Sequence, residues 1–211
     1  AVMAVGVASA QDINKAIELL EATDVERKDK RYVSLDVAYG IRARINLVMN
    51  NWQDAYNDAV DAINASDSKV MSINEAGKPA FIDINEKSWM WGVLITDKDR
   101  VATTGICNFP SHMGSFNYGY ASVGAWRLIN KKLFAAIPET DVRRNWFLDA
   151  ECNSASLTKA QLDYVKNSAK CPAYTQVKYA AMGDEMGTDN NSCDVPLMRI
   201  EEMYYIAYEA Q

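Results

Sequence analysis

The chain has 211 residues, of which 49% are hydrophobic and 24% are charged, a composition typical of a globular protein with enough residues for one sizeable core. Its net charge of −6 and its lack of a Lys/Arg cluster disfavour binding to nucleic acid or to an anionic membrane surface. The single histidine, His112, disfavours zinc-hydrolase and histidine-based catalytic sites, and the four cysteines lack the C-x-x-C spacing of a metal ribbon. We therefore expect no metal and no cofactor, and no apolar run reaches the roughly 20 residues of a membrane helix.

The N-terminal residues 1–10 are small and apolar, and they end in a sequence similar to the Ala-x-Ala cleavage site of a signal peptide. No basic segment precedes them, which favours the alternative that they are the end of a helix from a longer protein. A short amphipathic helix is predicted from Asp12, with Ile13, Ala16, Ile17 and Leu20 on its apolar face. Residues 21–31 are mostly charged and predict a linking turn in solvent.

Residues 34–65 predict two helices folded back on each other. Apolar residues recur every three or four positions in the first half, at Leu35, Ala38, Ile41, Ile45 and Val48, and Ser34 stands at the position of a helix cap. Asn50 and Asn51 then interrupt the pattern, because asparagine tolerates the left-handed turn conformation. The set Tyr39, Ala43, Trp52, Ala55, Ala59 and Ala62 resembles a tetratricopeptide-type helical hairpin, which implies packed neighbours.

Residues 66–124 lose the helical period and form a loop-rich region. Residues 67–80 are polar and predict a loop, and short strands are predicted at 81–84 and 89–95. The stretch 103–124 is rich in Gly, Ser, Asn and aromatic residues without any regular period. A loop of that length is usually functional, so we expect the binding region here.

The C-terminal half predicts further helices with irregular connections. The predicted elements are a helix at 122–137 with Trp126, Ile129, Leu133 and Ile137 on one side, an irregular segment at 149–173, a short strand at 174–179 and a C-terminal helix at 197–211. The predicted fold class is therefore mainly α, a single domain over residues 1–211 with tetratricopeptide-like helical hairpins, long irregular loops and a few short strands.

Four segments together resemble the RagB/SusD family. Residues 194–210 are similar to its D-x-P-hydrophobic-x-R-hydrophobic-x-E helix, which ends in A-E-A, and the pair of helices from Ala38 to Ala62 is similar to its Ala-rich helix pair. Residues 141–144 resemble its D-x-R turn, and residues 177–179 resemble the K-[FY] strand that follows. The order and approximate spacing agree over residues 12–211. Members of that family are longer, so we interpret the chain as an internal fragment.

The resemblance implies a lipid-anchored glycan-binding protein on the outer surface of a Gram-negative outer membrane. Such a protein passes oligosaccharides, starch-like ones among them, to a TonB-dependent SusC-type transporter, and it needs no catalytic residues. The membrane is then contacted only through a lipid on a cysteine expected upstream of this chain. Two alternatives remain open, a helical-repeat scaffold for protein partners and a glycoside hydrolase that uses two of the 28 acidic residues.

The candidate glycan-binding residues lie in the irregular loop, where aromatic planes can cover sugar rings and amides can meet their hydroxyl groups. They are Asn108, Phe109, His112, Phe116, Asn117, Tyr118 and Tyr120. The alternative is that the rings fold inward and pin the loop to the helices, an interpretation favoured for Trp126. Tyr118 and Tyr120 are the stronger candidates, because they flank Gly119 and share a face if the chain is extended.

Charged residues and cysteines suggest structural contacts. Ion pairs are predicted for Arg199 with Glu201 or Glu202 and for Asp141 with Arg143 or Arg144. The acidic residues Asp184, Glu185 and Asp189 offer oxygen ligands for calcium, although a solvated loop fits them better. Cys152 and Cys171 bracket one irregular segment and can pair in an oxidising compartment, whereas Cys107 and Cys193 lie on separate loops. Four free thiols remain the alternative.

Overall fold

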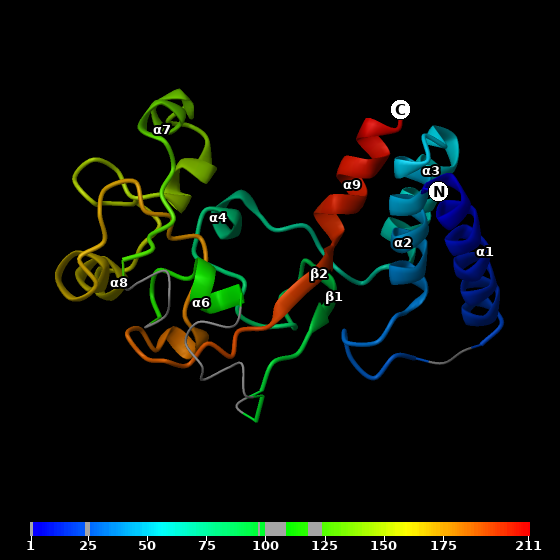
Figure 1. Ribbon diagram of the computed structural model, residues 1–211, viewed down its shortest axis with the longest axis horizontal. Helices are drawn as coiled ribbons and strands as arrows, with labels where there is room; N and C mark the ends of the chain where they lie inside the picture. The colour runs from blue at the N-terminus through cyan, green and yellow to red at the C-terminus, as the bar shows by residue number, and fades with distance from the viewer. Residues whose placement is uncertain (1, 24–25, 97, 100–108, 118–123) are drawn as a thin grey trace. The chain divides into compact units, whose positions relative to one another are not determined.

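The computed structural model describes residues 2–23, 26–96, 98–99, 109–117 and 124–211, and the chain divides into two compact units. Unit 1 consists of residues 1–70, 84–93 and 196–211, and unit 2 consists of residues 71–83 and 94–195. Helices predominate in the described part of the chain, where the strands β1 and β2 form a small sheet (Figure 1). This architecture confirms the predicted fold class.

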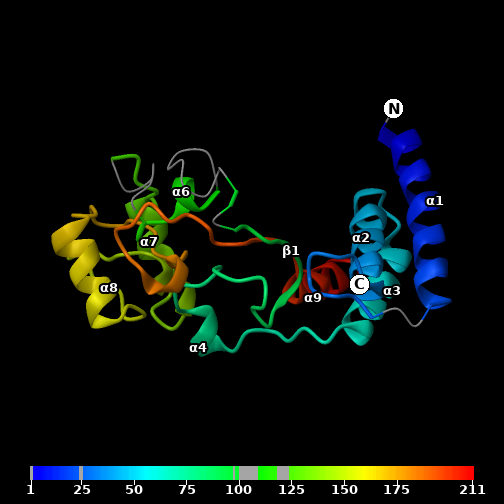
Figure 2. The same cartoon turned by 90° about the horizontal axis from the view of Figure 1, so that it is seen from below.

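Unit 1 contains the predicted hairpin, with further helices beside it. Its elements are α1 (Val2–Glu21), α2 (Leu35–Val48), α3 (Trp52–Ala65), β1 (Trp89–Val93), β2 (Val195–Arg199, whose first residue belongs to unit 2) and α9 (Ile200–Glu209). Helix α1 packs on α2, and α9 packs on both helices of the hairpin (Figures 1 and 2). Asn50 has a φ of 60°, the left-handed conformation expected where the chain turns between α2 and α3.

Small residues allow the hairpin and α9 to approach closely. The alanines predicted for the contact, Ala55, Ala59 and Ala62, are fully buried, and they share one hydrophobic cluster with Ile200, Met203 and Ile206 of α9. On α2, a Cβ added to Gly40 would lie 2.5 Å from the Sδ of Met198 and 3.0 Å from the Sδ of Met203. A residue larger than glycine at position 40 would therefore require these methionine side chains of β2 and α9 to move.

The buried face of α2 differs from the predicted stripe. Val48 was placed on that stripe but is 75% exposed, whereas Val37 and Ala43 are fully buried. Ser34 does occupy the N-cap position of α2, yet its hydroxyl donates to the Asp36 carboxylate instead of accepting from a backbone N–H. Asp36 is buried and also accepts from Ser66 Oγ at 2.7 Å. The Ser34 hydroxyl is therefore used to satisfy this buried carboxylate and not to cap the backbone of α2.

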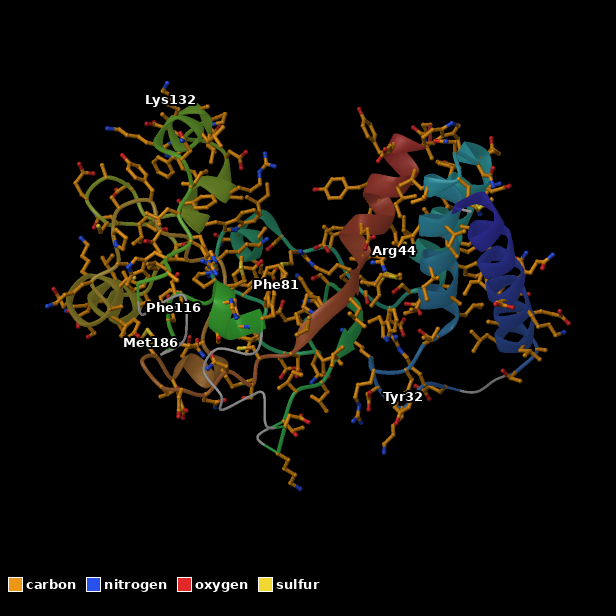
Figure 3. All side chains as sticks on the ribbon, in the orientation of Figure 1. Tyr32, Arg44, Phe81, Phe116, Lys132 and Met186 are labelled. Carbon is orange, nitrogen blue, oxygen red and sulfur yellow. The ribbon has the colours of Figure 1, made fainter. Side chains whose placement is uncertain are left out.

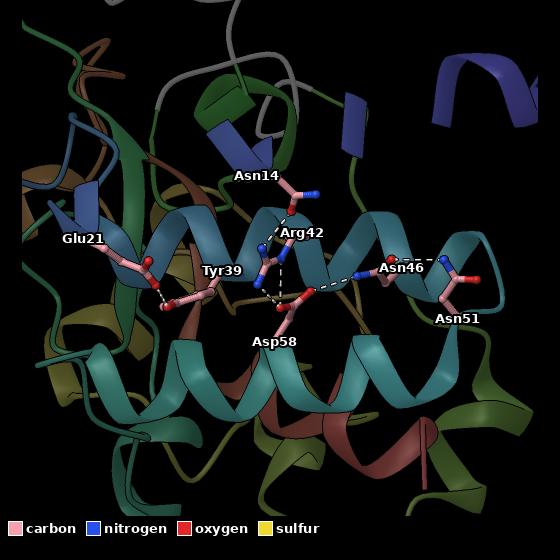
Figure 4. Close-up of polar contacts among 7 residues, drawn as sticks. All are labelled: Asn14, Glu21, Tyr39, Arg42, Asn46, Asn51 and Asp58. Carbon is pink, nitrogen blue, oxygen red and sulfur yellow. Dashed lines mark hydrogen bonds and ion pairs between the residues drawn. The ribbon is translucent and has the colours of Figure 1, made fainter. Parts of the chain in front are cut away.

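A polar network joins α1, α2 and α3 (Figure 4). Arg42 donates through Nε and Nη2 to Oδ1 of the buried Asp58 at 2.9 and 2.6 Å, and through Nη1 to Asn14 Oδ1 at 2.8 Å. Asn46 Nδ2 donates to the second oxygen of Asp58 at 2.8 Å. Both oxygens of the Asp58 carboxylate are therefore bonded, which is the condition under which a buried charge is tolerated.

Unit 2 is built from short helical turns and extended chain. Its elements are α4 (Ile73–Ala76), α6 (Phe109–Met113), α7 (Lys131–Ala136), the 3₁₀ turn η1 (Val142–Trp146), α8 (Lys159–Asp163), the π-helical turn η2 (Tyr164–Ser168) and the 3₁₀ turn η3 (Met182–Asp184). Its core contains Phe116, Leu148, Val165, Cys171, Val177 and Ala181. The segment around Val177 forms isolated bridges with three other parts of the chain. These bridges are Leu128–Thr175, Phe147–Gln176 and Ala80–Tyr179.

The predicted helix at 122–137 is wrong over residues 124–130. The helix α7 begins at Lys131, because the Asn130 side chain accepts from the backbone N–H of Lys132 at 2.9 Å and so caps it there. Before that cap, Leu128 and Ile129 are extended and bond to the chain at 174–175. Of the predicted stripe, Ile129 thus lies in extended chain, and Leu133 is in α7 but 62% exposed.

Other boundaries also differ from the sequence predictions. Residues 81–84 form no strand, and the predicted loop at 67–80 contains α4, which a capping box of Ser72 and Glu75 begins. The C-terminal helix begins at Ile200 and not at 197, because residues 195–199 pair with β1 as strand β2. Among the residues that the structure describes, no helix combines the length and apolarity needed to cross a membrane.

Candidate functional site

An aromatic cluster in unit 2 surrounds the ammonium group of Lys178. Its Nζ lies 4.4 Å from the centre of the Trp146 ring, 4.8 Å from that of Phe81 and 5.7 Å from that of Tyr179. The ring of Phe109 meets Tyr179 edge to face, with 5.3 Å between the centroids. We call these four rings, Phe81, Phe109, Trp146 and Tyr179, the aromatic cluster. They come from four separate segments of the chain.

Backbone pairing brings the first and last rings of the cluster together. Ala80 N–H donates to Lys178 O, and Ala180 N–H donates to Ala80 O, both at 2.9 Å. This pairing sets Phe81 beside Tyr179, with ring centroids 5.3 Å apart. Phe81 has a φ of 67°, a left-handed conformation that is strained for a bulky side chain. Such conformations concentrate at functional positions, so the strain marks Phe81 (labelled in Figure 3) as a residue to test.

Trp146 connects the aromatic cluster to a cleft. Its Nε1 donates to the backbone oxygen of Ala76 at 2.5 Å, which fixes the orientation of the ring. The cleft has a volume of about 420 Å³ and is lined by Ala136, Ile137, Pro138, Asp141, Arg143, Trp146 and Phe147. It therefore combines a fixed indole ring, apolar walls and a pair of charged groups, all contributed by one short stretch of the chain.

The charged groups of the cleft form the ion pair that the sequence predicted. Arg143 Nε lies 3.0 Å from each oxygen of Asp141, and its Nη2 donates to Oδ2 at 2.5 Å. This hydrogen bonding by the Arg143 side chain lowers the pKa of Asp141 to about 2. At neutral pH, Asp141 is a carboxylate that can only accept hydrogen bonds.

Arg144, the next residue, has a structural role. Its Nη1 donates to the carbonyl oxygens of Phe134 and Ile137, both at 2.9 Å, at the C-terminal end of α7. Its guanidinium carbon lies 4.1 Å from the centre of the Phe134 ring. The arginine thereby holds the helix that forms one wall of the cleft.

The residues predicted from the irregular loop divide into three groups. Phe109, in α6, is 42% exposed and belongs to the aromatic cluster, and His112 is half-buried at the end of the same helix. Phe116 and Asn117 are buried, in agreement with the alternative that this part of the loop folds inward. Asn117 Nδ2 donates to Asn190 O at 2.5 Å, and Phe116 (Figure 3) packs near Tyr164. Asn108, Tyr118 and Tyr120 lie outside the described residues.

The sequence did not single out three members of the aromatic cluster as site residues. Phe81 and Tyr179 are 98 positions apart and meet only through backbone pairing, which leaves no local pattern. Tyr179 belongs to the K-[FY] element of the resemblance, and Trp146 lies two residues after its D-x-R turn at 141–144, so a signal for Tyr179 and one close to Trp146 were present. No group of three His, Cys, Asp or Glu side chains in the described segments is placed to hold a metal ion.

No protein-family model matches the chain, and no curated protein matches it either. Solved structures do match. A SusD-like carbohydrate binding protein from Bacteroides vulgatus superposes with a TM-score of 0.67 at 18% identity, over 98% of this chain and 39% of its own. A SusD superfamily protein from Bacteroides thetaiotaomicron gives a TM-score of 0.63 at 18% identity, over 95% of this chain and 40% of its own. The chain has the SusD-like fold.

The resemblance to the RagB/SusD family is thus confirmed at the level of the fold. Surface glycan-binding protein A from Bacteroides thetaiotaomicron, in a complex with laminarihexaose, gives a TM-score of 0.52 at 16% identity, over 94% of this chain and 49% of its own. The SusD-like chain spans less than half the length of each of these structures.

Proposed function

We propose that this chain is part of a surface glycan-binding protein and that its aromatic cluster and the adjoining cleft contact an oligosaccharide. The observation that carries the proposal is the position of Trp146. Its ring contacts the ammonium group of Lys178, which the aromatic cluster surrounds, and it also lines the cleft. The likeness in fold to a SusD-like carbohydrate binding protein, and to surface glycan-binding protein A in its complex with laminarihexaose, supports it.

The chemistry of the surface suits a sugar. The C–H faces of a pyranose ring pack on aromatic planes, and its hydroxyl groups need donors and acceptors at the edge of those planes. Here Trp146 and Phe147 supply rings, and the Asp141–Arg143 pair supplies an acceptor and donors at the same cleft. Phe109 extends the aromatic surface through its edge-to-face contact with Tyr179. Of the residues predicted from the loop, Phe109 and His112 stay candidates for this contact.

The fold also supports a place in nutrient uptake. We propose that the whole protein acts with a TonB-dependent transporter of the SusC type and is held at the outer surface of the outer membrane by a lipid. In this role the protein recognises the glycan and does not cleave it. Incubation with laminarin and starch tests this, because a glycoside hydrolase would release reducing ends and a binding protein would release none.

Binding is tested by titration calorimetry with laminarihexaose and maltohexaose. We expect Trp146→Ala to weaken the affinity by at least about tenfold, since the main stacking surface is removed. Trp52→Ala is the matched control, because Trp52 is a half-exposed tryptophan of α3 in unit 1. Asp141→Asn keeps the shape of the cleft and removes the charge, and we expect a smaller loss.

Two results would contradict the proposed site. One is an unchanged affinity for Trp146→Ala in a protein whose circular dichroism matches that of the wild type. The other is an equal loss for Trp146→Ala and Trp52→Ala, which would indicate a general effect of removing an exposed ring.

A further inference from the structure

Two cysteines of unit 2 lie against each other although they are 19 positions apart in the chain. Cys152 Sγ donates to the backbone oxygen of Cys171 at 3.5 Å. Cys171 is a buried member of the unit 2 core, and Cys152 is half-buried and packs against the same cluster. Both are free thiols in this structure.

The backbone on each side of this contact is held in place. Cys171 N–H donates to Val165 O at 2.8 Å, and Cys152 N–H donates to Asp149 O at 3.2 Å. Between the two cysteines, a capping box of Thr158 and Gln161 begins α8. The cysteines therefore meet because the folded segment brings them together, and not because the chain between them is loose.

The Cys171 thiol is buried and has Cys152 as a neighbour. Burial raises the pKa of Cys171 to about 12, and the charge of Cys152 adds to this increase. Cys193, by contrast, is buried near Ala180, with its Sγ 3.7 Å from the carbonyl oxygen of that residue.

We propose that Cys152 and Cys171 form an intrachain disulfide in the native geometry and so close the segment 152–171. The inference does not depend on glycan binding. An external disulfide, such as oxidised glutathione, serves as the oxidant. The half-exposed Cys152 loses its proton and attacks one sulfur of the oxidant, which expels the first thiolate and leaves a mixed disulfide.

Cys171 completes the link. Its thiol loses a proton to water and its sulfur attacks Cys152 Sγ, which breaks the mixed disulfide and expels the second thiolate. The two cysteines together lose two electrons and two protons, and the oxidant gains them as two thiols. Because buried Cys171 has a raised pKa, we expect this second step to accelerate about tenfold per pH unit above neutral pH.

Peptide mapping tests the pairing directly, since trypsin places each cysteine in its own peptide. Cys107 falls in residues 101–127, Cys152 in 145–159, Cys171 in 171–178 and Cys193 in 179–199. The protein is oxidised with glutathione disulfide, alkylated with N-ethylmaleimide and digested without reductant. We expect the peptide 145–159 to be linked to 171–178, and Cys193→Ser to leave that link intact. Four alkylated cysteines, or a link from either peptide to 101–127 or 179–199, would overturn the proposal.

Thermal unfolding of the oxidised and reduced wild-type protein tests whether the link fits the native fold. A disulfide that closes about 20 residues without strain raises the unfolding midpoint, and we expect an increase of about 5 °C that dithiothreitol removes. Cys152→Ser should show no response to the oxidant. Because the main comparison uses a single wild-type chain, it holds even where a variant fails to fold. An oxidised protein with an equal or lower midpoint would contradict the native geometry.

Discussion

Units 1 and 2 are stabilised in different ways. In unit 1, long helices pack through small residues, and the polar groups of different helices bond to each other, as Arg42 and Asp58 do. In unit 2, side chains bond to the backbone of short turns, as Trp146 does to Ala76 and Arg144 does to Phe134 and Ile137. The proposed binding surface lies in unit 2.

The difference suggests how the proposed binding surface is held in place without long elements. Regular helices satisfy most of their own backbone, so in the helical part of unit 1 polar side chains such as Arg42 fix one helix against another. Outside these helices, side chains of unit 1 also bond to the backbone, as Arg27 does to Met90 O. The short turns of unit 2 leave carbonyl groups open, and large polar side chains satisfy them. Those same side chains are then held rigidly, as the indole of Trp146 is, and a rigid ring is what stacking on a ligand requires.

The comparison predicts that the largest loss in the free energy of unfolding follows from replacing Asp58. Asp58→Ala leaves Arg42 and Asn46 without the carboxylate that both bond, in a site where the Asp58 side chain is 5% exposed. We expect a loss of about 3 kcal/mol in the free energy of unfolding. This value is the lower end of the range for a broken buried ion pair, because the Arg42 side chain is 23% exposed. Urea unfolding measures this loss. Hydrogen exchange should show faster exchange in α1, α2 and α3.

The control is the exposed pair Lys15–Glu18 of α1, whose side chains are 61% and 67% exposed. Lys15→Ala should change the free energy of unfolding by less than about 0.5 kcal/mol. If Asp58→Ala behaves like this control, the network of Arg42 and Asp58 does not hold the helices of unit 1 together.

Local signals predicted unit 1 well. Repeated alanines and the Asn50–Asn51 break are properties of neighbouring residues, so the hairpin was found with nearly correct boundaries. The sequence pattern did not predict which residues of α2 are buried. Asp36 and Asn46 are polar yet buried, and their burial depends on partners in other parts of the chain, Ser66 and Asp58. A count of apolar positions cannot anticipate such pairs.

A smaller effect is expected from the arginines of unit 2, which offer a matched pair of neighbours. Arg144→Ala leaves the carbonyl groups at the end of α7 without their donor and removes the guanidinium from the Phe134 ring. We expect a loss of about 2 kcal/mol and faster hydrogen exchange over residues 131–147. Arg143→Ala removes the pair with Asp141, where the arginine side chain is 65% exposed, and should cost less than about 0.5 kcal/mol. Equal losses for the two variants would mean that the bonds to the backbone are not what stabilises this part of unit 2.

The sequence predicted unit 2 less well because its contacts are distant in the chain. The bond from Trp146 to Ala76 spans 70 residues, and no periodic pattern connects the two segments. Composition identified the segment that carries Phe109 as aromatic but missed the short helix α6 that begins there. It could not separate Phe109, which is 42% exposed, from Phe116, which is fully buried a few positions later. That distinction depends on the core formed with Leu148 and Val165.

The smallest effect concerns the bond between α1 and α2 at Tyr39, whose hydroxyl donates to the Glu21 carboxylate. This bond, together with burial, raises the pKa of Tyr39 from 10.0 to about 12. A raised pKa means that the folded state favours the protonated phenol. The stabilisation is therefore complete below pH 10 and is lost as the pH rises through about 12.

Tyr39→Phe should cost less than about 1 kcal/mol at neutral pH, since the contact is exposed. The difference in free energy of unfolding between wild type and Tyr39→Phe should then shrink over that alkaline range, because ionisation of the other tyrosines cancels between the two proteins. A difference that stayed constant to the end of the range would show that the bond to Glu21 does not tie α1 to α2, and would leave Arg42 and Asn14 as the polar contact between these helices.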